Sequence, residues 1–340
     1  MIRDAETGVT PLRLAALGGL LAAAVVLGAC GGEPAGPAVS DGSSGSGHSI
    51  VTMGPPPKAV TLSELGASQV SVRGAPDWMA DDGTTLYVKT DSGSVSVIDP
   101  AKSAEVRRLQ LGAAGLCQGI GVGGSAVWSC SPTPAGADDV LRVNLKSGKV
   151  QRFQVGKRTD QAHLDVAADR VWVITDAGLV GLNVKTAKPD PPIALGVPGT
   201  DLAAKDDRAY VLSRGAGAIV AVDLAARRVV AQSAVPDARA VTVSNEVWVV
   251  TGSELVALDK ERLQETARIP IAGEPCSVAA EGDRVFVSGT SPLLTEASGA
   301  THQVSRVITD TNSQCGDVHV GFGSIWVNAN EGDVVHRVPL

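Results

Sequence analysis

The segment Gly321-Phe322-Gly323-Ser324-Ile325-Trp326-Val327-Asn328-Ala329 holds the pattern that decides the fold, a glycine-rich turn followed by an aromatic residue within a short β-branched run. Alternation with period two, bounded by Gly, Asp or Asn, predicts a β-strand. The chain has only ten aromatic residues, and seven of them lie in such runs: Tyr87, Trp128, Trp172, Tyr210, Trp248, Phe286 and Trp326. Consecutive members are 41, 44, 38, 38, 38 and 40 residues apart. This even spacing predicts an architecture built from repeats.

Each repeat contains further strands around the aromatic one. A small-residue strand precedes it, a third strand ends in Asp or Asn, and a fourth alternating strand follows, as in Gly119-Ile120-Gly121-Val122, Val97-Ile98-Asp99 and Val150-Gln151-Arg152-Phe153-Gln154-Val155. Four strands in about 40 residues are typical of one propeller blade. The last repeat stops at Leu340 without its fourth strand, which Ser68-Gln69-Val70-Ser71-Val72-Arg73-Gly74 can supply. We therefore expect an all-β, seven-bladed β-propeller of four-stranded blades, closed by an N-terminal strand that completes the C-terminal blade.

Several of these segments resemble a known group of propellers. Tyr87-Val88-Lys89-Thr90, Gly282-Asp283-Arg284-Val285-Phe286-Val287 and the segment that ends at Ala329 look like the repeats of YVTN-type and streptogramin-lyase-like propellers. The resemblance covers about residues 69–340. It implies the propeller fold and, as one possible activity, a metal-dependent lyase or hydrolase with its site at the central channel. The lyases are said to use a His, a Glu and a divalent metal, whereas the sixth repeat, Glu274-Pro275-Cys276-Ser277-Val278, carries no His on its innermost strand.

The N-terminus has the parts of a bacterial export signal. Arg3 and Arg13 carry positive charge, and an uncharged apolar run follows from Leu14 to Ala29. Such a run before a small-residue cleavage point is typical of a signal peptide. Leu27-Gly28-Ala29-Cys30 resembles the lipobox of bacterial lipoproteins, which implies removal of residues 1–29 and acylation of Cys30. The alternative is a transmembrane anchor with an incidental cysteine, for which the apolar run is short.

The sequence predicts three parts and a location. Residues 1–29 form the signal peptide, residues 30–57 a lipidated cysteine with a flexible Gly/Ser/Pro tether, and residues 58–340 the propeller. We expect a monomeric propeller, lipid-anchored to the cell membrane on its extracytoplasmic side. The net charge of −7, without a basic stripe, argues against nucleic acid as a partner.

Four cysteines besides Cys30 predict disulfides, because an even number is expected in an exported protein. A two-residue turn at Gly123-Gly124 would place Cys117 across from Cys130 at a distance that suits a disulfide. Cys276 and Cys315 would then pair by elimination, between neighbouring repeats. A metal site is the alternative, although no close Cys/His spacing is present.

Acidic residues stand at the turns that enter six of the seven innermost strands. They are Asp77, Asp160, Asp201, Asp237, Glu274 and Asp317. If they converge, they form an acidic ring that binds a cation or a basic group; the alternative is that Asp simply favours turns. His163 and His319 lie on innermost strands, near Asp165 and Asp317, where each is either an acid–base group of the channel or a packed, hydrogen-bonded residue.

The sequence favours a non-catalytic binding or scaffold module over an enzyme. It contains no Gly-x-Ser-x-Gly elbow, no His-Glu-x-x-His and no phosphate-binding strand–loop–helix. We expect a protein, peptide or glycan partner, and we predict no cofactor, although a divalent cation in the channel is compatible with the pattern. The metal-dependent lyase or hydrolase remains the alternative.

Overall fold

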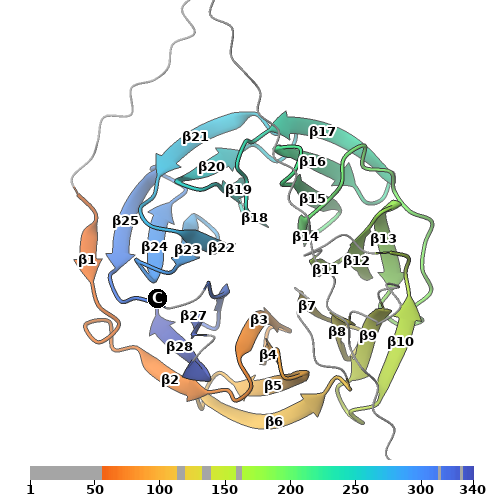
Figure 1. The fold of residues 1–340 in the computed structure, drawn as a ribbon, viewed down its shortest axis with the longest axis horizontal. Helices are drawn as coiled ribbons and strands as arrows, with labels where there is room; N and C mark the ends of the chain where they lie inside the picture. The colour runs from red at the N-terminus through yellow and green to blue at the C-terminus, as the bar shows by residue number, and fades with distance from the viewer. Residues whose placement is uncertain (1–55, 113–118, 132–138, 158–162, 313–314, 330–331) are drawn as a thin grey trace, which may run out of the picture. The chain divides into compact units, whose positions relative to one another are not determined.

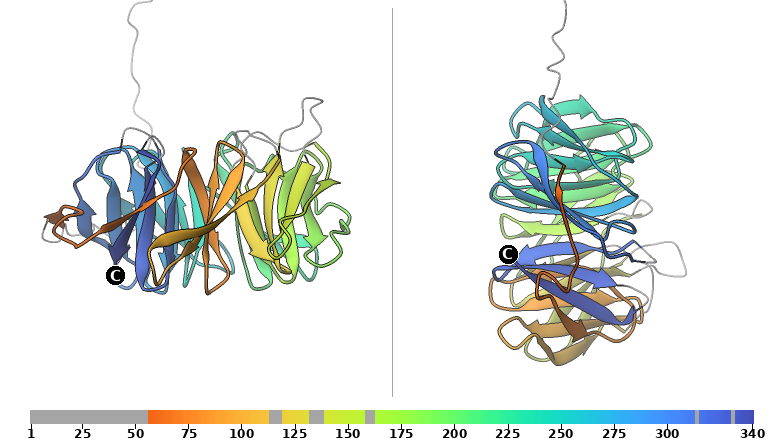
Figure 2. Two further views of the ribbon diagram at one scale, coloured as in Figure 1. Left: turned by 90° about the horizontal axis from the view of Figure 1, so that it is seen from below. Right: turned by 90° about the vertical axis from the view of Figure 1, so that its left-hand side faces the viewer.

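The computed structural model describes residues 56–112, 119–131, 139–157, 163–312, 315–329 and 332–340. Seven β-sheets stand around a common axis, each with one edge strand innermost (Figure 1). The side views in Figure 2 show the sheets as upright blades of a flat ring. This arrangement confirms the expected all-β, seven-bladed propeller.

The first four blades follow one another along the chain. Blade 1 contains β3 (Pro76–Asp81), β4 (Leu86–Thr90), β5 (Ser94–Asp99) and β6 (Ala104–Gln110). Blade 2 contains β7 (Ile120–Gly123), β8 (Ala126–Ser131), β9 (Asp139–Asn144) and β10 (Val150–Gln154). Blade 3 contains β11 (Leu164–Ala167), β12 (Arg170–Thr175) and β13 (Gly178–Asn183). Blade 4 contains β14 (Asp201–Lys205), β15 (Arg208–Ser213), β16 (Ala218–Asp223) and β17 (Arg228–Ala234).

The last three blades include the two N-terminal strands. Blade 5 contains β18 (Ala240–Val243), β19 (Val247–Val250), β20 (Glu254–Leu258) and β21 (Glu265–Pro270). Blade 6 contains β22 (Pro275–Glu281), β23 (Arg284–Gly289), β24 (Leu294–Ser298) and β25 (Gln303–Ile308), with β1 (Lys58–Val60) as a fifth, outermost strand. Blade 7 contains β26 (Val318–Gly321), β27 (Ser324–Ala329) and β28 (Val334–Pro339), and its outer strand is β2 (Ser68–Ser71).

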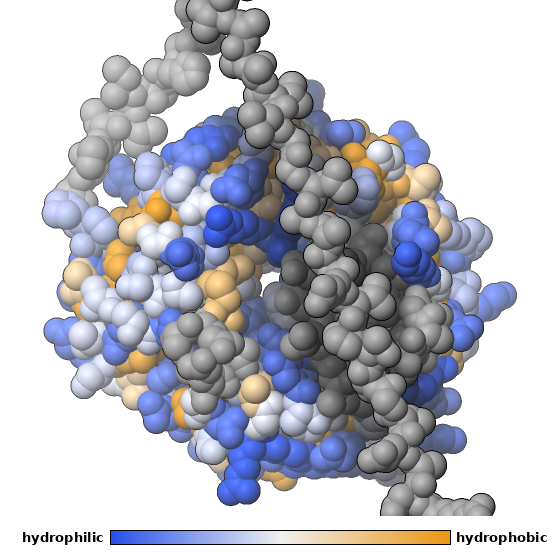
Figure 3. All heavy atoms as spheres, in the orientation of Figure 1, coloured by the Kyte–Doolittle hydropathy of each residue, from blue (hydrophilic) through white to orange (hydrophobic). Residues whose placement is uncertain are grey.

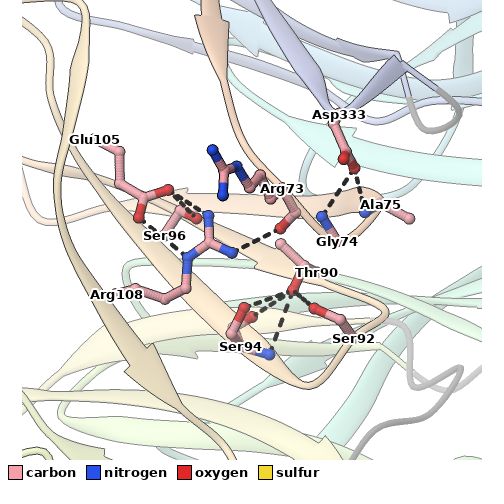
Figure 4. A network of polar contacts seen from close by, with 10 residues as sticks. All are labelled: Arg73, Gly74, Ala75, Thr90, Ser92, Ser94, Ser96, Glu105, Arg108 and Asp333. Atoms are coloured by element: carbon pink, nitrogen blue, oxygen red, sulfur yellow. Dashed lines mark hydrogen bonds and ion pairs between the residues drawn. The ribbon is translucent and has the colours of Figure 1, made fainter.

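The ring is closed at blade 7, as the sequence predicts. β2 pairs antiparallel with β28, and Val70 lies opposite Val335 in the hydrophobic core. Where the chain passes from β2 into blade 1, Asp333 Oδ1 accepts hydrogen bonds from the backbone N–H groups of Gly74 and Ala75, at 2.8 and 2.9 Å (Figure 4). β1 adds to blade 6 in parallel with β25, which was not foreseen.

The outer position of blade 3 is occupied by a proline-rich segment. Leu179 exchanges two backbone hydrogen bonds with Ile193, and Leu182 bridges Pro189. Prolines at 189, 191 and 192 interrupt a regular ladder, because proline has no N–H to donate.

The repeat aromatics fill the space between blades. Trp128 clusters with Val171 and Val173 of the next blade, and Trp326 with Leu86 and Val88 across the closure. Three of the indoles, those of Trp128, Trp172 and Trp326, donate to the carbonyl oxygen five residues earlier, at 3.0 to 3.2 Å. A repeating aromatic thus joins each blade to its successor, and this is why its spacing determines the fold.

The structure confirms one of the two predicted disulfides, and one cysteine of the other lies outside the described residues. Cys276 and Cys315 form a disulfide between blades 6 and 7, as expected. Cys130 is disulfide-bonded, but Cys117 lies outside the described residues. The geometric argument for that pair was wrong, because the turn is Gly124-Ser125, both with positive φ, and Val122 therefore lies opposite Val127. Each residue of β8 therefore lies opposite a residue two positions later than predicted, and the Cys117–Cys130 disulfide itself stays a prediction.

The predicted signal peptide, Cys30 and nearly all of the tether lie outside the described residues. Within the part of the chain that the structure describes, no helix is long and apolar enough to cross a membrane.

Candidate functional site: the axial cavity

The innermost strands enclose a cavity of about 340 Å³ on the ring axis. Figure 3 shows an opening at the centre of one face. Two layers of side chains follow from the strand register. The residues paired with the repeat aromatics form the middle layer: Ala80, Gly121, Asp165, Ala203, Thr242, Ala279 and His319. Two residues earlier on each strand stands the entry layer: Trp78, Gly119, His163, Asp201, Ala240, Ser277 and Asp317.

The side of the ring on which the innermost strands begin is called the entry face. It carries the segments that precede those strands, such as residues 235–239 and 271–274. The opposite face carries the turns between the first and second strands and between the third and fourth strands of each blade.

The described members of the predicted acidic set occupy different environments. Asp201 and Asp317 are buried and line the cavity, whereas Asp237 and Glu274 are exposed on the entry face. Asp77 is half-buried beside the ring, with its carboxylate 3.5 Å from Lys89 Nζ. Asp160 lies outside the described residues. Within the described residues, the structure therefore does not bring the acids together as one ring.

The buried carboxylates of the cavity join neighbouring blades. Asp317 Oδ2 accepts from the backbone N–H of Met79 in blade 1 at 3.0 Å, and its Oδ1 accepts from Ser277 Oγ in blade 6 at 2.8 Å. Asp201 Oδ2 accepts from Val241 N of blade 5 at 2.9 Å.

Asp165 repeats this geometry one layer deeper in the cavity. Its Oδ2 accepts from Ala204 N of blade 4 at 2.7 Å. In all three cases the carboxylate belongs to one blade and the amide to the next, one strand position further on. We call these three contacts the clasps.

Both histidines line the cavity, but each pairs with a carboxylate that the sequence did not suggest. His163 Nδ1 contacts Asp201 Oδ1 of the next blade rather than Asp165. His319 Nε2 lies 2.7 Å from Asp81 Oδ2 of blade 1 rather than beside Asp317 as a partner. Each imidazole is therefore held between two blades.

Trp78 and Asp81 are cavity residues that sequence reasoning missed. The Trp78 ring lies 4.3 Å from the ring of His163, edge to face, and its Nε1 is buried without a hydrogen-bond partner. The sequence contains a signal for Trp78. When the innermost strands are aligned on the residue opposite the repeat aromatic, Trp78 lies at the same level as Asp317.

Burial perturbs the acids of this region. Desolvation raises the pKa of Asp317 to about 6, although Ser277 and the N–H of Met79 stabilise the ionised form. Desolvation likewise raises the pKa of Asp165 to about 6. It raises the pKa of Asp77 to about 7, against the opposing effect of Lys89. Burial alone would raise the pKa of Asp81, but the hydrogen bond to His319 holds it below its usual value.

The cavity is acidic but its acids are occupied. Four carboxylates and two imidazoles line it, and no Lys or Arg is among the described lining residues. With the clasps and a second donor to each group, both carboxylate oxygens of Asp317, Asp201 and Asp165 accept a hydrogen bond from the chain itself. Over the described ranges, no three His, Cys, Asp or Glu side chains converge in a way that would hold a metal ion.

Comparison with known proteins supports the fold. No family model matches the chain, and no curated protein matches it. Among solved structures it is similar to BamB from Moraxella catarrhalis, with a TM-score of 0.56 and 14% sequence identity. The match covers 80% of this chain and 98% of the BamB chain. At this identity the similarity concerns the fold alone.

Proposed function

We propose that this chain is an extracytoplasmic, lipid-anchored propeller that acts as a non-catalytic scaffold and binds a protein partner on its entry face. The observation that carries the proposal is the use of the cavity carboxylates as clasps. Groups that accept hydrogen bonds from the next blade hold the ring rigid, and a rigid ring is a suitable platform for recognition by the loops that it positions.

The anchor and the charge of the chain support the same function. The lipobox-like sequence that ends at Cys30 supports attachment to the membrane. Asp237 and Glu274 are exposed on the entry face, where Asp237 Oδ2 lies 3.9 Å from Arg239 Nη2, and both carboxylates can meet a basic surface. The negative charges of these two residues, which we call the acidic rim, favour a partner with Lys or Arg at the contact.

Site-specific photo-crosslinking in intact cells tests the choice of face. A photo-reactive amino acid replaces Ser253, exposed on the entry face, or Ala225, exposed on the opposite face. We expect a discrete protein adduct from position 253 and none from position 225. Equal adducts from both positions, or none from 253, would contradict the proposal.

Charge variants identify the contribution of the acidic rim. Asp237→Asn with Glu274→Gln is expected to weaken the adduct about five- to tenfold, with the larger effect at low salt. The matched control is Asp207→Asn with Glu261→Gln, which removes two charges from the opposite face. Cys30→Ala should release the chain from the membrane fraction. A divalent cation that stabilises the purified chain stoichiometrically would instead favour the lyase or hydrolase hypothesis.

A further inference from the structure

A second cavity, of about 610 Å³, lies at the rim between blades 6 and 7. It is bounded by the segment 61–67, which links β1 to β2 and which we call the strap. The strap is held to blade 6, because Leu62 N donates to Asp310 Oδ2 at 2.7 Å and Thr309 Oγ1 donates to Val60 O at 3.2 Å. Its own turn is fixed by Ala67 N, which donates to Leu62 O at 3.0 Å. We call the space behind it the strap cleft.

An unengaged imidazole faces the strap cleft. His336 lies on β28 opposite Gln69 of β2, and both residues line the cleft. Among the described residues, none forms a hydrogen bond or ion pair with the imidazole of His336, whereas the imidazoles of His163, His302 and His319 each contact a carboxylate. Desolvation lowers the pKa of His336, with Asp310 opposing the shift. A neutral imidazole offers one donor and one acceptor.

The remaining lining supplies hydrogen-bonding groups without positive charge. Asp310, Thr309, Thr311 and Ser63 contribute a carboxylate and hydroxyl groups, while Leu62 and Leu293 provide an apolar surface. No Lys or Arg is among the described lining residues. The cleft is therefore unsuited to an anion, and its polar groups match a ligand that both donates and accepts hydrogen bonds.

We propose that the strap cleft binds a neutral polyhydroxylated ligand, a mono- or disaccharide unit. Hydroxyl groups of the ligand would meet His336, Gln69 and Asp310, and the apolar face of the sugar ring would lie against Leu62 and Leu293. The volume is within the range of small-molecule sites. The cleft lies at the outer rim, where Leu293 and residues 309–312 of the entry-face segments meet the strap. It does not include Asp237 or Glu274 and does not depend on the protein partner proposed above.

Calorimetry, ligand-observed NMR and protein-observed NMR of the histidine rings, all on the purified full chain, test this site. The probes are maltose, cellobiose and trehalose, in a detergent without a sugar headgroup so that the detergent does not compete. We expect saturable binding of at least one disaccharide, with a change in the His336 ring resonances. A polymer that binds through the same unit would identify a glycan as the source, and binding of the free sugar would identify a soluble ligand.

Two pairs of variants make the result specific. His336→Gln and Gln69→Leu are each expected to weaken binding about five- to tenfold, the usual effect of one lost hydrogen bond. The matched controls are His302→Gln and Gln232→Leu, which change the same residue types at distant positions and should leave affinity unchanged. Absence of binding by all three sugars, equal binding by the variants, or tighter binding of a sugar phosphate than of the neutral sugar would each overturn the proposal.

Discussion

Replacing Asp317 by alanine should destabilise the ring, because this carboxylate joins three blades. The variant loses the hydrogen bonds from Met79 N–H and Ser277 Oγ. Hydrogen bonds to a charged group contribute about 1.5 to 3 kcal/mol each, so the two together contribute about 3 to 6 kcal/mol.

Two further effects decide the net value. The alanine variant no longer buries a charge, and the relief of this desolvation offsets part of the loss. The N–H of Met79 is left unsatisfied, at a cost of about 1 to 3 kcal/mol. We therefore expect a net loss of about 3 kcal/mol in the free energy of unfolding. With an unfolding entropy of about 2.1 cal/mol/K per residue over about 280 residues, this corresponds to a melting temperature lower by about 5 °C.

Equilibrium unfolding in urea, followed by tryptophan fluorescence, measures this loss. The signal suits the chain, because Trp128, Trp172, Trp248 and Trp326 are fully buried. The control is Asp237→Ala, an exposed acid on the same face whose Oδ2 accepts from Gly252 N at 3.0 Å and lies 3.9 Å from Arg239 Nη2. Its expected cost is at most about 1 kcal/mol. If the two variants differ by less than about 1 kcal/mol, the clasps do not stabilise the ring and the argument fails.

Three more predictions follow from particular contacts. Burial raises the pKa of Asp317 to about 6, so between pH 4 and pH 6 the folded chain keeps a proton that the unfolded chain releases, and this carboxyl stabilises the fold less as the pH rises. The stability advantage of the natural chain over Asp317→Asn should therefore shrink by up to about 3 kcal/mol over this range. Urea titrations that show a constant difference between the two chains would disprove this. Cys276→Ala with Cys315→Ala should lower the free energy of unfolding by up to about 4 kcal/mol, from a loop of 39 residues, and calorimetry showing no change in melting temperature would contradict it. Gly181→Ala should cost about 1 to 3 kcal/mol, because its Cβ would lie 2.8 Å from the Trp172 ring, whereas Gly215→Ala meets nothing within 4 Å and should be neutral in the same urea assay.

Strong local patterns made the fold predictable from the sequence. Each aromatic sits in an alternating strand and packs on the next blade, so one spacing encodes both the strand and its neighbour. The closure by Ser68–Ser71 followed from counting strands, since the seventh repeat was one strand short. Neither argument required knowledge of which residues approach the axis.

The site was harder to predict, because turn position and layer are decided by tertiary contacts. Gly123-Gly124 is the better turn by composition, but Ser125 accepts a positive φ of 59° and moves the register by two residues. Asp201 begins its innermost strand in the entry layer, whereas Asp237 lies three residues before Ala240, the entry-layer residue of its blade. An offset of three residues separates a buried clasp from a solvated turn, and composition does not encode that offset.

The direction of the clasps sets an order for the folding of a chain that is made from its N-terminus. Asp165 and Asp201 each precede the amide that they bind, so blades 4 and 5 each meet an acceptor that is already in place. Asp317 is the exception, because it is synthesised after its partner Met79, which lies in the first blade. β1 and β2 also stay unpaired during synthesis, because their partners β25 and β28 lie in the last two blades. The first strands to be synthesised are therefore the last to be paired, and a nascent chain exposes two open sheet edges until the final blade arrives.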